Sequence, residues 1–148
     1  MPVGSLNDET ALSDHAIESK AGQDSTTLEE LRAKALRATK PPEVSEWRQA
    51  VQLRRKRRAD IREYVLMRAG GICELTGEPA PFFKADGTPY LEVHHIKRLS
   101  DGGLDHPVNC AAITPNAHRE IHFGAAGRDL DEWLAELIAA KEAAAACL

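Results

Sequence analysis

The sequence contains few aromatic residues, few cysteines and no long apolar run. Aromatic side chains make up only 5% of the 148 residues, so a hydrophobic core must be mostly aliphatic. The three cysteines are far apart and do not suggest a disulfide framework. No apolar run approaches the roughly 20 residues that a membrane-spanning helix needs. The N-terminus also lacks the basic and apolar regions of a secretory signal, so we expect a cytoplasmic protein with the length of one domain.

The overall charge is acidic, and the positive charge is concentrated in one segment. The chain carries a net charge of −4, whereas residues 47–68 hold eight Lys or Arg side chains against two Asp or Glu. Nucleic-acid-binding proteins often concentrate positive charge in this way. The alternative is an ordinary solvated helix face, and charge alone leaves both interpretations open. The run in question is Arg54, Arg55, Lys56, Arg57 and Arg58.

Apolar spacing and turn residues predict where the helices lie. Residues 1–26 are polar without an apolar period, which predicts a disordered tail. Thr27 followed by Glu30 fits a capping box and predicts a helix over 28–38. Helical spacing predicts a second helix from about 44 to 69, ended by Gly70-Gly71. Asp129 is the expected N-cap of a final helix that ends near residue 146.

Between these helices the pattern changes to short strands. Asp86-Gly87 lies between two apolar runs, over 82–83 and 90–96, and predicts a β-hairpin turn. A short strand over 109–113 is expected next. Pro115 then favours the first turn of a short helix over 115–123.

Five of the six histidines fall within 29 residues, at positions 94, 95, 106, 118 and 122. His118 and His122 are four residues apart on the predicted helix, so both imidazoles can reach one metal ion. In a strand, successive side chains point to opposite faces. One of His94 and His95 can therefore join that ion while the other is left free as a base.

The histidines have two other interpretations, as surface or packed residues and as a structural zinc site. A single histidine is more often a surface or packed residue, but the whole set fits that interpretation poorly. A structural zinc site needs four protein ligands in a closed tetrahedron. His94, His118 and His122 supply three, which leaves an open position suited to catalysis. His106, beside a proline in a loop, is expected to be exposed and uninvolved.

Several stretches around these histidines resemble the motif of HNH endonucleases. The resemblance is strongest to bacterial HNH nucleases related to 5-methylcytosine-specific restriction protein A. It covers residues 60–124 well and extends more weakly back to about residue 28. It is carried by LEVHHI over 91–96, LSDGG over 99–103, Asn109, Pro115-Asn116 and HREIH over 118–122.

This resemblance implies an α+β fold, a ββα-metal (His-Me) finger with flanking helices. The expected organisation is a disordered tail over 1–26, a helical basic extension over 27–58, an HNH nuclease domain over 59–126 and a C-terminal helix over 127–148. Carried over by residue, His94, His118 and His122 would ligate one divalent ion. His95 would be the general base, oriented by a backbone carbonyl, and Asn109 would stabilise the loop and help orient that base.

The resemblance also bears on cofactors and partners. The ion is left open among Mg²⁺, Mn²⁺, Ni²⁺, Co²⁺ and Zn²⁺. Relatives usually hold a structural zinc with two Cys-x-x-Cys pairs, but here Cys73 keeps only the first position. Thr76, Thr114 and Ala117 stand at the other three. One thiolate should not hold zinc, so we expect the zinc ribbon to be lost.

The implied function is hydrolysis of DNA phosphodiester bonds by a metal-dependent endonuclease. DNA would be the partner, with Arg98, Arg119 and the run 54–58 touching its phosphates. The alternative is a non-catalytic DNA-binding module on a degenerate HNH scaffold, since three of the four zinc thiolates are missing. A secreted-toxin nuclease domain ranks last, because no delivery domain is visible.

Overall fold

The computed structural model describes residues 26–39 and 47–148. Except for Thr26, the tail expected over 1–26 lies outside these residues, as do residues 44–46 of the second predicted helix. None of the described helices is long and apolar enough to cross a membrane. The elements are α2 (Leu28–Ala38), α3 (Trp47–Ala69), β1 (Glu92–His95), η2 (Leu99–Asp101), η3 (Pro107–Asn109), β2 (Cys110–Ile113), α4 (Pro115–Phe123) and α5 (Gly127–Ala146).

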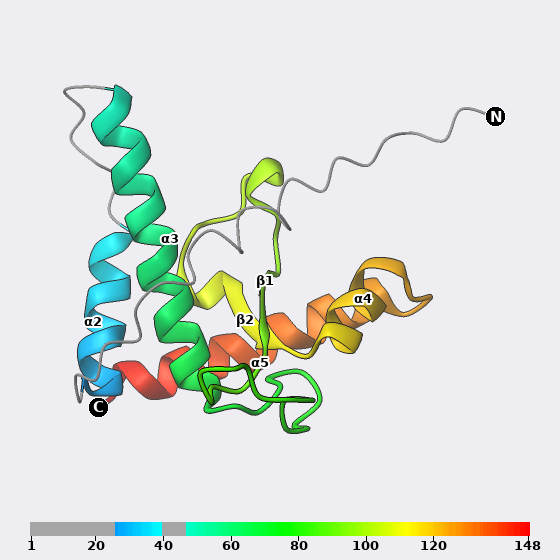
Figure 1. Cartoon of the computed structure of the whole chain (residues 1–148). Helices are drawn as coiled ribbons and strands as arrows, with labels where there is room; N and C mark the ends of the chain where they lie inside the picture. The colour runs from blue at the N-terminus through cyan, green and yellow to red at the C-terminus, as the bar shows by residue number, and fades with distance from the viewer. Residues whose placement is uncertain (1–25, 40–46) are drawn as a thin grey trace.

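The two N-terminal helices lie side by side, and α5 runs across the foot of α3 (Figure 1). The predicted capping box of α2 is confirmed: the Glu30 amide donates to Thr27 Oγ1, and the Thr27 amide donates to Glu30 Oε2. The second predicted helix is present from Trp47 and ends at Ala69. It ends there because Gly70 and Gly71 adopt positive φ angles of 58° and 80°, which glycine tolerates. The α3 helix is continuous across position 58–59, where the sequence suggested a boundary between two parts.

The β1 and β2 strands form a two-stranded antiparallel sheet, which α4 follows directly. The fold is therefore α+β, with the strand–strand–helix order of a ββα finger. The expected hairpin around Asp86-Gly87 is wrong in its pairing, because residues 83 and 89 form only an isolated bridge. The bridging residue on one side is Pro89, which has no amide hydrogen and cannot extend a ladder. The β1 strand pairs instead with β2, with His94 opposite Ala111 and His95 opposite Cys110.

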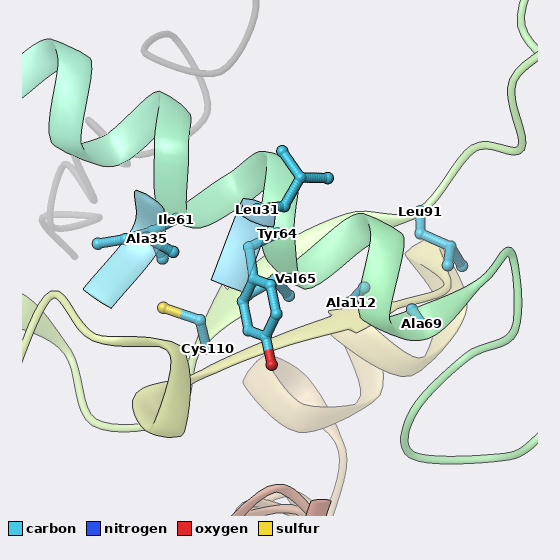
Figure 2. Packing of buried hydrophobic residues seen from close by; sticks show 9 residues of the cluster. All are labelled: Leu31, Ala35, Ile61, Tyr64, Val65, Ala69, Leu91, Cys110 and Ala112. Atoms are coloured by element: carbon cyan, nitrogen blue, oxygen red, sulfur yellow. The ribbon is translucent and has the colours of Figure 1, made fainter. Parts of the chain in front are cut away.

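The sheet lies between two hydrophobic clusters, one on each face. Every residue of β2 is buried. Its side chains alternate: Cys110 and Ala112 join the cluster of α2 and α3, whereas Ala111 and Ile113 join that of α4 and α5. Figure 2 shows the first cluster, where the β2 side chains meet those of α2 and α3. Small residues on β2 allow helices to approach both faces closely. The strand therefore lies at the centre of the fold.

A buried ion network joins α3 to α5 and to the start of β2. The Arg68 guanidinium, 6% exposed, binds Glu74 at 2.8 Å and Glu142 at 2.9 Å. It also donates to the carbonyls of Pro107 and Cys110, at 3.1 and 2.7 Å. The Tyr64 hydroxyl donates to Glu142 at 2.6 Å. Removing one partner of such a buried network leaves an uncompensated charge, so these contacts lock the relative positions of the elements.

The α5 helix begins three residues earlier than the expected cap implies. Its N-cap is Ala126, and Asp129, the predicted cap, lies inside the first turn. A carboxylate in the first turn still interacts favourably with the helix dipole. The start is set by packing against α4, because a Cβ on Gly127 would lie 2.1 Å from the carbonyl oxygen of Ile121. The absence of a side chain at Gly127 thus lets α5 pass close behind α4.

Candidate active site

Three imidazoles converge between β1 and α4. His94 comes from β1, and His118 and His122 lie one turn apart on α4. The ring centroids are 4.8 to 5.3 Å apart, and one ligand nitrogen of each ring lies within 4.8 Å of the others. The α4 helix predicted over 115–123 is confirmed, with its N-terminus capped by Thr114 Oγ1. The three histidines expected to form one centre are therefore brought together.

The spacing of these nitrogens fits a shared cation. The Nε2 atoms of His118 and His122 are 3.1 Å apart. Two nitrogens each about 2.0–2.1 Å from one ion, at angles between octahedral and tetrahedral, would be roughly 2.8–3.4 Å apart. His94 is 4% exposed, whereas His122 is exposed. The group thus has one buried and one open side, and the open side can admit a ligand that is not protein.

Two carboxylates orient these imidazoles from behind. Glu92 Oε2 lies 2.5 Å from His118 Nδ1, and Asp131 Oδ1 lies 2.8 Å from His94 Nε2. Carboxylates commonly fix the ring orientation of metal-binding histidines in this way. With these nitrogens engaged, Nε2 of His118 and Nδ1 of His94 remain for an ion. Sequence reasoning missed Asp131, which comes from α5, 37 residues away from His94.

Burial lowers the pKa of His94 to about 4, although the hydrogen bond that its ring donates to Asp131 opposes the shift. The imidazole is therefore neutral at neutral pH. Only a neutral imidazole has a lone pair for a metal ion. The most buried of the three imidazoles is thus in the form that can bind a metal ion.

His95 lies on the other face of β1, because side chains alternate along a strand. It is opposite Cys110, on the face that packs against α2 and α3. Its ring is 26% exposed, and its Nε2 lies 3.3 Å from Asp105 Oδ1. We expected a backbone carbonyl to orient this ring, but the observed partner is a carboxylate. No local pattern singled out Asp105, which lies in the loop before η3.

Asn109 joins the loop after β1 to the loop before η3. Its Oδ1 accepts from the Lys97 amide at 2.9 Å, and its Nδ2 donates to the Lys97 and Leu104 carbonyls at 2.8 and 2.9 Å. Its own carbonyl accepts from the Ile96 amide. These bonds have the geometry of the loop clamp that the resemblance implied for Asn109.

A second group of metal-ligating side chains consists of His95, Asp105 and Cys110. Their ligand atoms also lie within 4.8 Å of one another. Burial raises the pKa of the Cys110 thiol to about 12, so the thiol is protonated at neutral pH. Sequence reasoning had given Cys110 no ligand role.

The positions where relatives carry zinc cysteines come together in space. The Thr114 amide donates to Cys73 Sγ at 3.4 Å, and the Ala117 amide donates to Thr114 Oγ1 at 3.3 Å. Burial raises the pKa of Cys73, but hydrogen bonds from Thr76 and Thr114 outweigh this effect and the net pKa lies below the ordinary value. Hydrogen bonds thus link residues that thiolates and zinc would otherwise join. In the described part of the chain, neither candidate metal group includes Cys73.

The expected DNA-contacting side chains lie on the surface. Arg57 is partly buried, and its Nε donates to the Leu53 carbonyl. The Arg119 guanidinium lies 6.0 Å from the ring centroid of Phe123. His106 lies outside both histidine groups, and its Nδ1 accepts from the Val108 amide at the start of η3. Of the cations expected to contact DNA, those that are exposed are Arg54, Arg55, Lys56, Arg58, Arg98 and Arg119.

Comparison with known proteins connects this site to a group of nucleases. No family model matches the chain. Over 74 residues, half of the chain, it is 47% identical to the Type IV methyl-directed restriction enzyme EcoKMcrA of Escherichia coli (strain K12). The fold resembles that of the Type IV phosphorothioation-dependent restriction endonuclease ScoMcrA, with a TM-score of 0.66 and 27% identity over 90% of this chain. The chain spans only 27% and 26% of these two proteins. Sequence identity over half of the chain and the shared fold together show that the chain is homologous to part of the McrA type IV restriction enzymes.

Proposed function

We propose that the chain is a metal-dependent HNH endonuclease that hydrolyses DNA phosphodiester bonds. The observation that carries the proposal is the convergence of His94, His118 and His122, whose ligand nitrogens lie within 4.8 Å of one another. Two of these rings are backed by carboxylates. Homology to restriction enzymes supports DNA as the substrate.

In this proposal, His94, His118 and His122 hold one divalent ion. A cation there would stabilise the negative charge that develops on the scissile phosphate and on the departing 3′ oxygen. Glu92 and Asp131 keep two of the rings in register by accepting their second N–H groups. His122 is exposed, so the open side of the group faces solvent, from which the phosphate enters.

His95 removes a proton from the attacking water. Histidine suits this role at neutral pH because its unperturbed pKa is about 6.5. His95 is next to His94 in the chain but on the opposite face of β1, which leaves it out of the ligand set. The products then carry 5′-phosphate and 3′-hydroxyl ends. Asn109 holds the surrounding loop in place.

DNA binding is assigned to cations on the surface of the chain. The basic run 54–58 extends over about one and a half turns of α3 and contacts several phosphates without reading sequence. Arg98 and Arg119, close in sequence to the histidines, contact phosphates near the scissile bond. The basic extension over 27–58 thus serves the nuclease unit over 59–126, and the helix over 127–148 supplies Asp131 to it.

We further propose that the ion at the histidines is the only metal and that no structural zinc is bound. Hydrogen bonds from Thr114 and to Thr114 stand where relatives use zinc thiolates. Elemental analysis of the purified chain tests this: one ion per chain is expected, lost in His118→Ala and retained in Cys73→Ser and Cys110→Ser. Zinc that survives His118→Ala but is lost in either serine variant would contradict it.

Plasmid nicking with and without EDTA tests the activity. The wild-type chain should nick supercoiled DNA with an added divalent ion and stop when EDTA removes that ion. His118→Ala should be inactive, whereas His106→Asn is the matched control, because asparagine also caps the start of η3. DNA binding without nicking under every divalent ion would instead favour the non-catalytic module.

A further inference from the structure

We propose that Asp105 is a positioning residue that holds His95 in the tautomer able to accept a proton from water. This inference rests on the proposed role of His95 as general base. Asp105 lies in the loop between η2 and η3, ten residues from His95 in sequence. Neither the HNH resemblance nor the histidine pattern assigned it a role.

The contact fixes which ring nitrogen carries the proton. Asp105 Oδ1 lies 3.3 Å from His95 Nε2. A carboxylate accepts hydrogen bonds, so the neutral imidazole donates through Nε2 and keeps its lone pair on Nδ1. Both side chains are about a quarter exposed, at 26% and 27%, so solvent screens this interaction only in part.

The loop that carries Asp105 is held at two points. Asn109 Nδ2 donates to the carbonyl of Leu104, the residue before Asp105. Two residues before Asp105, a Cβ on Gly103 would lie 2.0 Å from the Lys97 carbonyl oxygen. The loop therefore passes against the backbone of Lys97, just after β1, at a distance that only glycine permits. Together these contacts place the carboxylate beside His95 instead of leaving it on a free loop, and they connect Asn109 to His95 through Asp105.

The buried thiol beside this pair does not compete for the proton. Cys110 Sγ lies within 4.8 Å of the ligand atoms of His95 and Asp105, but burial raises its pKa to about 12. It is therefore a neutral neighbour at neutral pH. A metal ion held by His95, Asp105 and Cys110 would instead occupy the imidazole and block its role as base.

Steady-state cleavage kinetics test the role of Asp105. Asp105→Ala should lower kcat by about 10- to 100-fold, the range known for carboxylates behind metal-binding histidines, while KM and metal affinity stay within about twofold. Asp105→Asn keeps the size but not the charge, and its amide NH2 can donate to Nε2 and favour the other tautomer, so kcat should fall at least as far as in Asp105→Ala. Asp105→Glu should recover part of the loss. Asp101→Ala, an exposed aspartate in the same loop region with the same change in charge, is the control and should keep wild-type kcat.

A double-mutant cycle separates this role from a general effect on folding. In the His95→Ala background, Asp105→Ala should cause no further loss, because the residue acts only through His95. Equal losses in both backgrounds would overturn the proposal, as would wild-type kcat in Asp105→Ala. So would a loss confined to KM or metal affinity. Gly103→Ala should lower kcat in the same way, because it displaces the loop.

Nuclear magnetic resonance of the ring nitrogens gives a readout that does not need activity. In the full chain loaded with Mg²⁺ or Zn²⁺, His95 should carry its proton on Nε2, and Asp105→Ala should give a mixture of tautomers. A proton on Nδ1, no change in the variant, or a second equivalent of metal that depends on Cys110 would each overturn the proposal. If the wild-type chain cleaves no DNA, the proposed function fails, yet the tautomer of His95 still decides whether Asp105 positions it.

Discussion

His94 and His95 are neighbours in the chain, yet their side chains lie on opposite faces of β1. His94 is opposite Ala111, on the side of α4 and α5, and His95 is opposite Cys110, on the side of α2 and α3. Each ring also has a carboxylate of its own, Asp131 for one and Asp105 for the other. The strand therefore holds the two imidazoles apart. Each should be replaceable by mutation without disturbing the other.

Replacing His95 should abolish cleavage but not metal binding. His95→Ala removes the proposed base and leaves the three converging histidines intact, so we expect a loss of at least about 100-fold in kcat. Calorimetric titration with Mn²⁺ should give the wild-type affinity. The same protein should then be tested for plasmid nicking. Nicking at the wild-type rate would show that His95 is not the base, and loss of Mn²⁺ binding would place it among the ligands.

Removing the carboxylate behind His94 should weaken metal binding. Asp131→Ala leaves His94 Nε2 without its partner, so Mn²⁺ affinity should fall about 10- to 100-fold. Calorimetric titration measures this directly. Asp129→Ala is the matched control, because Asp129 is an exposed aspartate on the same helix. Equal affinities in the two variants would show that Asp131 does not support the ligand set.

The basic run on α3 should make DNA binding steeply dependent on salt. Each phosphate contact contributes a slope of about −0.9 in a plot of the logarithm of affinity against that of salt concentration. Converting Arg54, Arg55, Lys56 and Arg58 to glutamine should therefore make the slope shallower by about 3 to 4. Binding is best measured by fluorescence anisotropy with His95→Ala as the uncleaving background. Arg37→Gln, an exposed arginine on α2, should leave the slope unchanged. A wild-type slope near zero would exclude phosphate contacts by this run.

The metal-free chain should lose stability as the pH falls from about 6.5 towards 4. In the folded chain burial lowers the pKa of His94 to about 4, against about 6.5 for an unfolded histidine. Between these values only the unfolded chain binds the proton, so the free energy of unfolding decreases by at most about 3 kcal/mol as the pH drops through this window. Above pH 6.5 this contribution is constant. Urea unfolding at several pH values in EDTA measures it, and His94→Gln should show a shallower pH dependence. Identical slopes in both proteins would contradict the prediction.

The parts of the fold that the sequence predicted are those set by local signals. The α2 helix follows from a capping box within four residues, and α4 follows from Pro115 at its start. The pairing of His118 with His122 needs only helical spacing. By contrast, the partner of β1 is decided by packing against two separate clusters, and no local pattern contains that information. The expected turn at Asp86-Gly87 is a tight loop that Thr88 closes on the Asp86 side chain, without strands on either side.

The carboxylates of the site could not be predicted for a related reason. Asp131 meets His94 only because Gly127 lets α5 pass close to α4. Asp105 meets His95 only because the loop at Gly103 folds against Lys97. Each contact depends on a close approach of two backbones that are distant in sequence. Resemblance to a family identified the histidines, since their order and spacing are part of the motif, but it contains no information on these neighbours.

The contact between Arg68 and Glu142 has a consequence for the order in which the protein matures during synthesis. The two residues are 74 positions apart, and the guanidinium also holds the carbonyls of Pro107 and Cys110 on either side of Asn109. A ribosome adds residues from the N-terminus, so every histidine of the site is made before Glu142. Until α5 emerges, Arg68 has Glu74 but lacks its second counter-charge. All the candidate metal ligands are therefore synthesised before Glu142, the residue that completes the ion network of Arg68 beside the loop.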